Sequence, residues 1–178
     1  MNKKTVILPA FRHVVPSDFE AMMEKYALEG WNVDVLNPIN SMYITFHKTE
    51  PKKYRYVFDL NLRPTKDYRQ TYEQFGWALV GNLSSCFIWR KAYTDVRPES
   101  FTDRESLMRR NLRVRNALAF CLALALIGAA ANVVGLFFEI KDGVVLDILG
   151  QGLGLVICIG LAGVLWRFIR KMNKNLDR

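Results

Sequence analysis

The stretches NALAFCLALALIGAAANVVGLFF, residues 116–138, and ILGQGLGLVICIGLAGVLW, residues 148–166, decide the fold of this 178-residue chain. The first runs for 23 residues without a charged side chain. As a helix it spans about 35 Å at ~1.5 Å per residue, more than the ~30 Å hydrocarbon core of a bilayer. The second has about the length that one crossing needs. A chain this short has no soluble core that could bury both, so we predict a two-helix transmembrane hairpin.

The net charge of +8 divides unevenly along the chain. Residues 1–103 carry 14 Lys or Arg against 12 Asp or Glu, whereas residues 104–178 carry 11 against 5. This excess flanks the two apolar stretches, and the intervening residues 139–147 carry a net charge of −2. By the positive-inside rule we expect a multi-pass protein of the cell membrane, with both termini cytoplasmic. Because the charge is juxtamembrane, the expected partners are anionic lipid headgroups at 104–115 and 167–178, and nucleic acid is rejected.

The residues before the hairpin repeat a pattern. Gly30-Trp31 recurs as Gly76-Trp77, and each pair follows a predicted helix (17–29 and 67–75) and precedes two strand-like runs. We therefore predict an α+β soluble domain of two β-α-β-β repeats, with a largely antiparallel sheet of about six strands and two helices on one face. Alternation over residues 54–62 predicts a half-buried strand.

Local motifs support these boundaries. Ser17 and Glu20 form a predicted capping box, and Thr102 with Glu105 forms another at the start of a basic helix that could continue into the first span. Gly30 and Gly76 are expected to end their helices in the left-handed conformation. Trp31 and Trp77 are better explained as core anchors than as ligand-stacking residues.

These observations divide the chain into six segments. They are a cytosolic duplicated α+β domain (1–100), a basic juxtamembrane helix (101–115), a first transmembrane helix (116–138), an extracytoplasmic turn (139–147), a second transmembrane helix (148–166) and a basic cytosolic tail (167–178).

Six stretches of the sequence form a recognisable pattern: Phe11-Arg12, Leu28-Glu29-Gly30-Trp31, residues 43–60, Tyr72-Glu73-Gln74-Phe75-Gly76-Trp77, Trp89-Arg90-Lys91 and Phe101-Thr102-Asp103-Arg104-Glu105-Ser106. They resemble the domain-of-unknown-function 2812 family, small bacterial proteins with a soluble N-terminal domain and often C-terminal membrane helices. The resemblance covers about residues 11–106. It implies no activity and carries over no catalytic residue, and the frequent neighbourhood of PadR-like regulators hints at signalling or an envelope response.

The sequence contains no convergent set of nucleophile, base or metal ligands. Its two histidines, His13 and His47, have no thiol or carboxylate at a ligand spacing, and no phosphate-binding glycine loop is present. We therefore expect a protein that is not an enzyme and needs no catalytic, cofactor or metal site.

Candidate binding residues come from a sheet face that the helices are expected to leave uncovered. Such a face could bind a protein or small ligand, or it could be an ordinary solvated surface. The Thr102–Glu105 box leaves two neighbours without a structural reason, so we predict that they couple the domain to the hairpin. The candidates are Tyr43, His47, Arg55, Asp59 and Trp89 on the face, and Asp103 and Arg104 beside the box.

Small and polar residues within the spans predict close helix contact. Asn132 and Gln151 have similar predicted depths, where a hydrogen bond between them would stabilise the hairpin by ~0.6–2 kcal/mol. The same residues could instead form a homodimer contact, and both alternatives remain open. The packing candidates are Ala131, Asn132, Gly135, Gly150, Gln151 and Gly154.

The leading hypothesis is a membrane-anchored, cytosol-facing regulatory or adaptor module that binds a protein or small ligand. The alternative is a small accessory subunit of a membrane complex such as a transporter. An enzyme acting on membrane-derived substrates is the third and weakest hypothesis.

Overall fold

A computed structural model of the chain shows two compact units, which we describe separately: Met1–Asn111 and Leu112–Leu176. The structure describes residues 1–178 except 1, 34–35, 37–41, 100–103, 143–144 and 177–178, and the side chains of 104, 141 and 142 are likewise not described.

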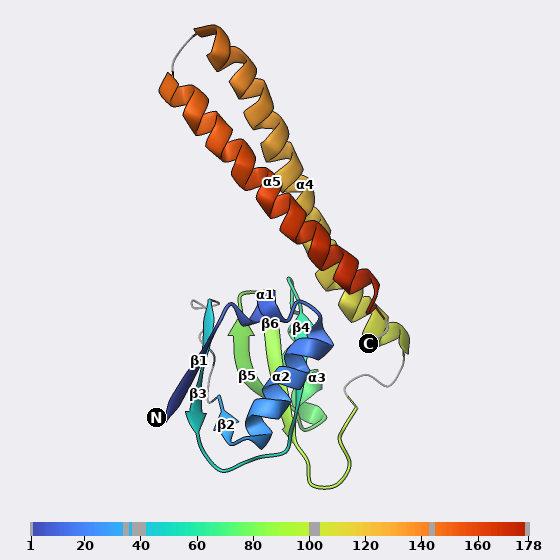
Figure 1. Ribbon diagram of the computed structural model, residues 1–178. Coiled ribbons are helices and arrows are strands. Elements are labelled where there is room, and N and C mark those ends of the chain that lie inside the picture. Colours follow the sequence, from blue (N-terminus) through green and yellow to red (C-terminus); the bar gives the residue numbers. More distant parts are fainter. Residues whose placement is uncertain (1, 34–35, 37–41, 100–103, 143–144, 177–178) are drawn as a thin grey trace. The chain divides into compact units, whose positions relative to one another are not determined.

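The first unit contains two antiparallel sheets of three strands each (Figure 1). One has the order β1-β3-β2 and the other the order β4-β6-β5, so in each sheet the last strand along the chain lies in the middle. The strands are β1 (Lys3–Ile7), β2 (Trp31–Asn32), β3 (Tyr43–Lys48), β4 (Tyr54–Leu60), β5 (Ala78–Leu83) and β6 (Cys86–Ala92).

The prediction of six antiparallel strands is confirmed, whereas the single sheet is replaced by two. An isolated parallel bridge from Leu36 to Gly81 links them. A Cβ at Gly81 would stand 2.7 Å from the Leu36 carbonyl oxygen, so only glycine permits this approach. A short helix, α1 (Pro9–Arg12), adds an element to the first half that the second half lacks. The exact repeat therefore stays a prediction.

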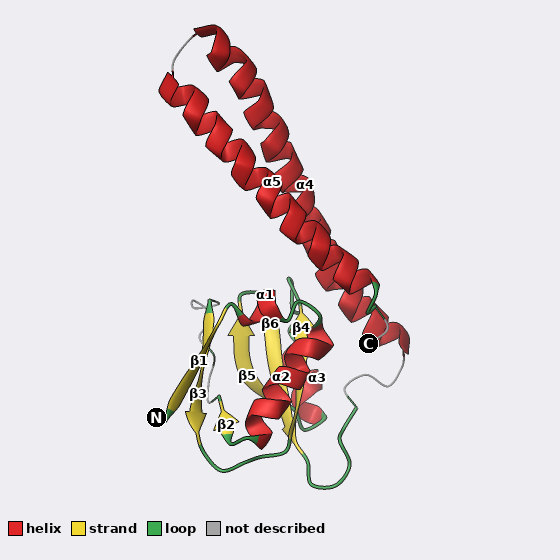
Figure 2. Ribbon diagram, in the orientation of Figure 1, coloured by secondary structure: helices red, strands yellow, loops and turns green. Residues whose placement is uncertain are grey.

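The two longer helices of this unit cover opposite faces of the second sheet (Figure 2). Side chains of α2 (Pro16–Leu28) share a core with Tyr56 and Phe58 of β4. The intervening Val57 packs instead with Trp89 in a cluster that includes side chains of α3 (Tyr68–Gln74). Since successive strand side chains point to opposite faces, the prediction of both helices on one face is wrong. For the same reason β4 is buried on both faces and not half-buried.

The predicted capping box at the start of α2 is not formed. The helix begins one residue earlier, at Pro16, with Val15 as its N-cap and no side-chain cap. Proline suits this position because its fixed φ matches the helix and its missing N–H has no intrahelical partner there. The Ser17 hydroxyl is buried and makes no hydrogen bond to a described residue. Glu20 is thereby available for a different role.

Both predicted helix-ending glycines have the expected conformation. Gly30 follows α2 with φ +78° and Gly76 follows α3 with φ +77°. Trp77 is buried next to its glycine, and the half-buried Trp31 packs against the main core, as expected for core anchors.

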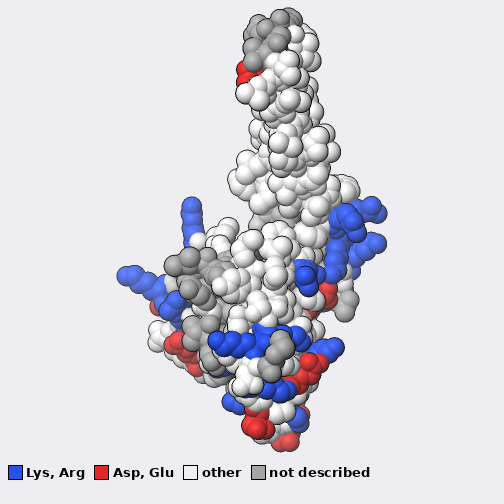
Figure 3. Space-filling model, turned by 60° about the vertical axis from the view of Figure 1, so that its left-hand side comes forward, with Lys and Arg blue, Asp and Glu red and all other residues white. Residues whose placement is uncertain are grey.

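The second unit is a hairpin of two long helices. Helix α4 (Arg104–Asp142) begins within the first unit and is continuous, and α5 (Val145–Asn173) follows. Both are long and apolar enough to cross a membrane, and only 6% and 11% of their most apolar windows are buried. One face of the hairpin is uncharged along most of its length (Figure 3).

We predict that Gly30→Ala destabilises the protein more than Gly76→Ala. Both variants force an L-residue into the left-handed region, at a cost of about 1–2 kcal/mol. Only at Gly30 would the new Cβ also meet a backbone atom, 2.6 Å from the Thr49 carbonyl oxygen, whereas at Gly76 the nearest atoms belong to the flexible Lys91 side chain at 3.6 Å. Urea unfolding of the full-length protein in detergent, followed by tryptophan fluorescence, measures the difference. Equal losses of unfolding free energy in the two variants would contradict the prediction, because they would show that the backbone moves away from the new Cβ at Gly30.

Candidate functional site

A cluster of buried charges lies where α2 meets the edge strand β4. The Phe58 N–H donates to Glu20 Oε1 at 3.0 Å, and the Tyr56 N–H donates to Glu24 Oε1 at 3.4 Å. Glu20 and Glu24 are one helical turn apart, so both carboxylates face the strand. The two carboxylates accept the hydrogen bonds that a neighbouring strand would otherwise accept. They therefore prevent another strand from pairing with this edge of the sheet.

Three arginines compensate the two carboxylates. Arg55 Nη1 lies 3.0 Å from Glu20 Oε2 and 2.8 Å from Glu24 Oε1. Arg97 binds Glu24 through two nitrogens, each at 3.1 Å. Arg110 Nη1 donates to Glu20 Oε1 at 2.5 Å. These arginines come from β4, from the segment after β6 and from α4, so the cluster joins three parts of the chain that are distant in sequence.

The Arg110 side of the cluster is shielded from solvent. Arg110 is 1% exposed, Glu20 2% and Asn111 0%. Arg110 Nε also donates to Asn111 Oδ1 at 3.3 Å. A buried ion is costly unless it is paired and hydrogen-bonded, so the start of α4 must stay against α2 for this arrangement to persist. The first two turns of α4 are therefore part of the folded domain.

A second polar group is enclosed by aromatic rings on the other face of β4. The buried Asp59 carboxylate accepts hydrogen bonds from the hydroxyls of Tyr68 (3.0 Å) and Tyr72 (3.4 Å). Trp89 stacks on Tyr72 with ring centroids 4.4 Å apart and donates its indole N–H to Tyr68. Burial, followed by the charge of Asp59, raises the pKa of Tyr68 well above its ordinary value. The phenol therefore remains a hydrogen-bond donor, and the group stabilises the packing of α3.

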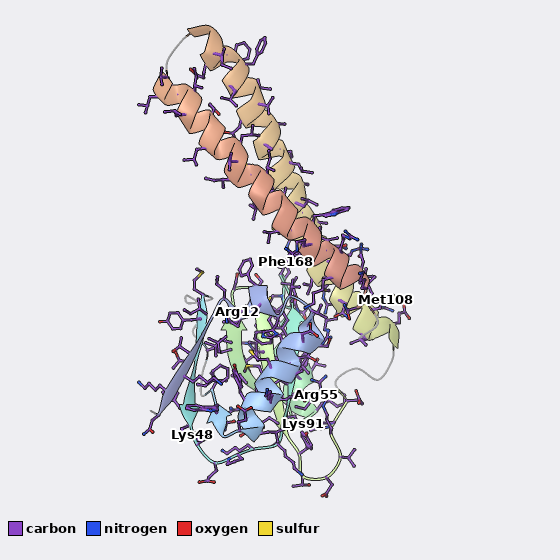
Figure 4. The ribbon with its side chains drawn as sticks, in the orientation of Figure 1. Arg12, Lys48, Arg55, Lys91, Met108 and Phe168 are labelled. Carbon is purple, nitrogen blue, oxygen red and sulfur yellow. The ribbon has the colours of Figure 1, made fainter. Side chains whose placement is uncertain are left out.

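The predicted uncovered face does not exist as a continuous surface. Arg55, Asp59 and Trp89 are buried, the first in the ion cluster and the other two beneath α3. Tyr43 is exposed and His47 half-buried on β3, in the other sheet. Figure 4 shows Arg55 within the first unit, beside its helices. The prediction failed because α3 covers the face that was expected to be open.

Of the two predicted coupling residues, Asp103 lies outside the described residues, and the side chain of Arg104 is not described. Their role stays a prediction. Among the described residues of α4, Arg110, about two turns further on, bonds to Glu20 of α2.

In the described part of the hairpin, three glycines each face a side chain of the other helix. Gly128 faces Cys158, Asn132 faces Gly154, and Gln151 faces Gly135. The pairs share one antiparallel register, since each step forward along α4 matches an equal step back along α5. A Cβ at Gly135 would stand 2.7 Å from Gln151 Cδ, so these glycines make room for the amide side chains.

The predicted hydrogen bond between Asn132 and Gln151 is not among the contacts of the described residues. The Asn132 amide donates instead to the Gly128 carbonyl at 2.8 Å, one turn earlier on its own helix. Of the remaining packing candidates, Ala131 is exposed and Gly150 has no atom within 4 Å of its Cβ position. The contacts at Gly135 and Gly154 are therefore made within one chain.

The one cysteine of the domain is not poised for chemistry. Burial, and secondly the nearby Asp59 carboxylate, raises the pKa of the Cys86 thiol to about 12. The thiol stays protonated at neutral pH, whereas the thiolate is the nucleophile and the metal ligand. Among the described residues, no group of three or more His, Cys, Asp or Glu side chains could hold a metal ion.

The sequence reasoning missed the Glu20–Arg110 pair. Glu20 fits a capping box, and Arg110 is one of several juxtamembrane arginines that fit the positive-inside rule. A usable signal existed in the sequence. Glu20 follows Phe19 and precedes Met22 and Met23 on the apolar side of the helix, where a carboxylate needs a cationic partner.

The fold and the site together define a class of protein: an α+β domain whose buried ion cluster includes the start of a long apolar helix hairpin. A family model described as "Protein of unknown function (DUF2812)" matches residues 16–123. The chain belongs to this family, and the matched region contains both Glu20 and Arg110. No curated protein and no solved structure matches the chain.

We predict that Arg110→Ala lowers the free energy of unfolding of the domain by about 3 kcal/mol, because it removes one partner of a buried ion pair. Arg109→Ala is the matched control. Its exposed pair with Glu105, one turn away, contributes at most about 0.5 kcal/mol. Urea unfolding of both full-length variants in detergent provides the measurement. A double-mutant cycle with Glu20→Gln is expected to give a coupling energy of about 1–3 kcal/mol. Equal losses of unfolding free energy in Arg110→Ala and Arg109→Ala would contradict the burial of Arg110.

Proposed function

We propose that this chain is a membrane-anchored, cytosol-facing regulatory or adaptor module that binds a protein or a small ligand. The observation that carries the proposal is the burial of Arg110 against Glu20. A domain that only needed to be near the membrane could be joined to it by a flexible linker. Here a residue of the long apolar helix is built into the folded domain, so a change in the domain can reach the helix through a defined contact.

The exposure of the hairpin supports the membrane anchoring. Large apolar side chains such as Phe120, Phe137 and Trp166 are more than half exposed. In water this surface would far exceed what soluble proteins leave uncovered, whereas in a bilayer it faces lipid. The core helix of a soluble protein would show the opposite pattern, with its apolar window mostly buried.

The charge pattern supports a cytosolic domain. The Lys and Arg residues that flank the apolar stretches favour both termini in the cytoplasm and an outward-facing turn at 139–147. The basic side chains at the end of α5 line a shallow cavity of about 260 Å³, which provides a surface for anionic headgroups. These residues are Arg167, Arg170, Lys171 and Lys174.

One observation favours the second function, an accessory subunit of a membrane complex. Gly152, Gly160 and Gly163 of α5 have no described atom within 4 Å of their Cβ positions. Glycines that face outward let another helix approach closely. A partner bound there would be an integral membrane protein or a second copy of this chain, and the cytosolic domain would not be required for its capture.

An exchange of the hairpin separates the two functions. In one variant residues 112–176 are replaced by an unrelated two-span hairpin, and in the other Gly152, Gly160 and Gly163 are replaced by Leu. Both are compared with the wild type by cross-linked affinity purification from native membranes. The adaptor function predicts the same partner in all three samples. Loss of the partner from both variants would contradict it and favour the subunit function.

A further inference from the structure

The strand β1 forms an open edge of the first unit. The opposite outer edge, β4, is covered by the carboxylates of Glu20 and Glu24. Strand β2 is only two residues long, and the segment after it bonds to the edge strand β5, since the Leu36 N–H donates to the Val80 carbonyl oxygen at 3.0 Å. In Figure 1, β1 lies at the outside of the domain, next to β3. Among the described strands, β1 pairs with β3 alone, so its other side is uncovered.

The backbone of β1 presents every second residue to this open side. The Leu8 N–H donates to the Met42 carbonyl oxygen at 2.6 Å, and the Lys48 N–H donates to the Asn2 carbonyl oxygen at 3.0 Å. In an antiparallel pair, residues that bond to the neighbouring strand alternate with residues whose N–H and C=O groups point away from it. The even-numbered residues therefore bond to β3, whereas the odd-numbered residues direct these groups outward and have exposed side chains. The odd-numbered residues are Lys3, Thr5 and Ile7.

Two of the usual protections of a sheet edge are missing from β1. Proteins protect such edges with proline, with bulges or with charged side chains. Strand β1 contains no proline, and its register with β3 has no shift over its five residues. Its charges lie at one end, and the ammonium of Lys4 is held 3.8 Å from the centre of the Tyr26 ring. The uncharged part of the edge, residues 5–7, is therefore accessible to another strand.

The two lysines determine how a second copy of β1 can pair with the first. In a parallel pair in register, Lys3 and Lys4 would each lie opposite the same residue of the other copy at about 4.8 Å, and like charges directly opposite are destabilising. In an antiparallel pair centred on Thr5, Lys3 lies opposite Ile7 of the second copy, and Lys4 lies opposite Val6. The two Lys3 residues are then about 14 Å apart, which exceeds the Debye length of about 8–10 Å. The charges therefore favour the antiparallel pair.

The antiparallel pair also continues the side-chain pattern of the sheet. Thr5 and Thr45 lie side by side, with their hydroxyl oxygens 3.4 Å apart. Thr5 of the second copy would lie on the other side of Thr5, so threonines would form one row across four strands. Threonine pairs of this kind stabilise neighbouring strands. Because both copies use the same strand, the contact is closed by a two-fold axis and adds no third copy.

We propose that β1 is a dimerisation strand, which pairs antiparallel with β1 of a second copy of the chain around a two-fold axis at Thr5. A second copy is the occupant because its β1 supplies the opposite threonine and keeps the lysines apart. A pair of five-residue strands is a small contact, so its strength rests on the proposed membrane anchoring. Copies held in one membrane have a raised effective concentration. The contact lies in the first unit and does not involve the hairpin.

Disulfide formation between single cysteines tests the pair in the full-length protein. Cys121 and Cys158 are replaced by Ser, and the variants are Thr5→Cys and, as a matched control, Thr45→Cys. The two copies of Thr5 would be about 5.5 Å apart, a distance that a disulfide can bridge. Thr45 is the neighbour of Thr5 on β3, and three strand spacings, about 14 Å, would separate its two copies. Native membranes are oxidised with copper phenanthroline, the products are identified by mass spectrometry, and each yield is divided by the maleimide labelling of that cysteine.

The pairing predicts at least about fivefold more disulfide dimer at position 5 than at position 45. When differently tagged Lys3→Cys and Ile7→Cys variants are expressed together, mixed dimers should exceed dimers of either variant alone, because Lys3 lies opposite Ile7 in this register. Equal yields at positions 5 and 45, or an excess of Lys3→Cys dimers over mixed dimers, would overturn the inference. Disulfides from position 5 to a different protein would identify a foreign strand as the occupant and would also overturn it.

Alkaline carbonate extraction of the same membranes tests the anchoring separately. An anchored chain stays in the membrane pellet whether or not its β1 strands pair. Release of the wild-type chain into the supernatant would contradict the anchoring, whereas the disulfide yields decide the strand pairing in either case.

Discussion

The buried carboxylate of Glu20 is the constraint on which the arrangement of the domain depends. It accepts a hydrogen bond from the edge of β4 and binds Arg55 from that strand and Arg110 from α4. Each of these contacts compensates part of the cost of burying the charge. The sheet edge, the helix α2 that covers it and the start of α4 are therefore stabilised by one group.

The hairpin depends on a different physical principle. In a bilayer the lipid tails are as apolar as leucine, so helices associate through close packing and not through hydrophobic burial. The facing pairs of Gly154 with Asn132 and Gly135 with Gln151 provide that packing, because each glycine admits one amide side chain from the other helix. The large apolar side chains are left exposed on the outside of the hairpin.

Much of the fold could be predicted from the sequence, because the patterns that predict it are local. The apolar stretches, the six strands and the left-handed Gly30 and Gly76 each depend on residues that are close together in the chain. The alternating residues of β4 correctly predict a strand, but alternation does not show whether a helix covers its second face. The prediction of an open face was therefore wrong. The ion cluster joins residues up to 90 positions apart. Glu20 also fits a local capping box with Ser17, which accounts for the residue without any distant partner.

The same division applies to function. Membership of the DUF2812 family and the two long apolar helices follow directly from the chain, whereas the role of the domain is a proposal that depends on how α4 is held. Because the start of α4 is folded into the domain, an event at the domain has a physical route into the rest of this helix.

Hydrogen exchange of the full-length protein in lipid nanodiscs tests this claim most directly. The account predicts that the amides of residues 107–111 are as slow to exchange as those of β4 in the wild type. In Glu20→Ala they should lose this protection while the amides of residues 118–135 keep theirs, because only the contact with the domain is removed. Rapid exchange at residues 107–111 in the wild type, or no change in the variant, would contradict the account.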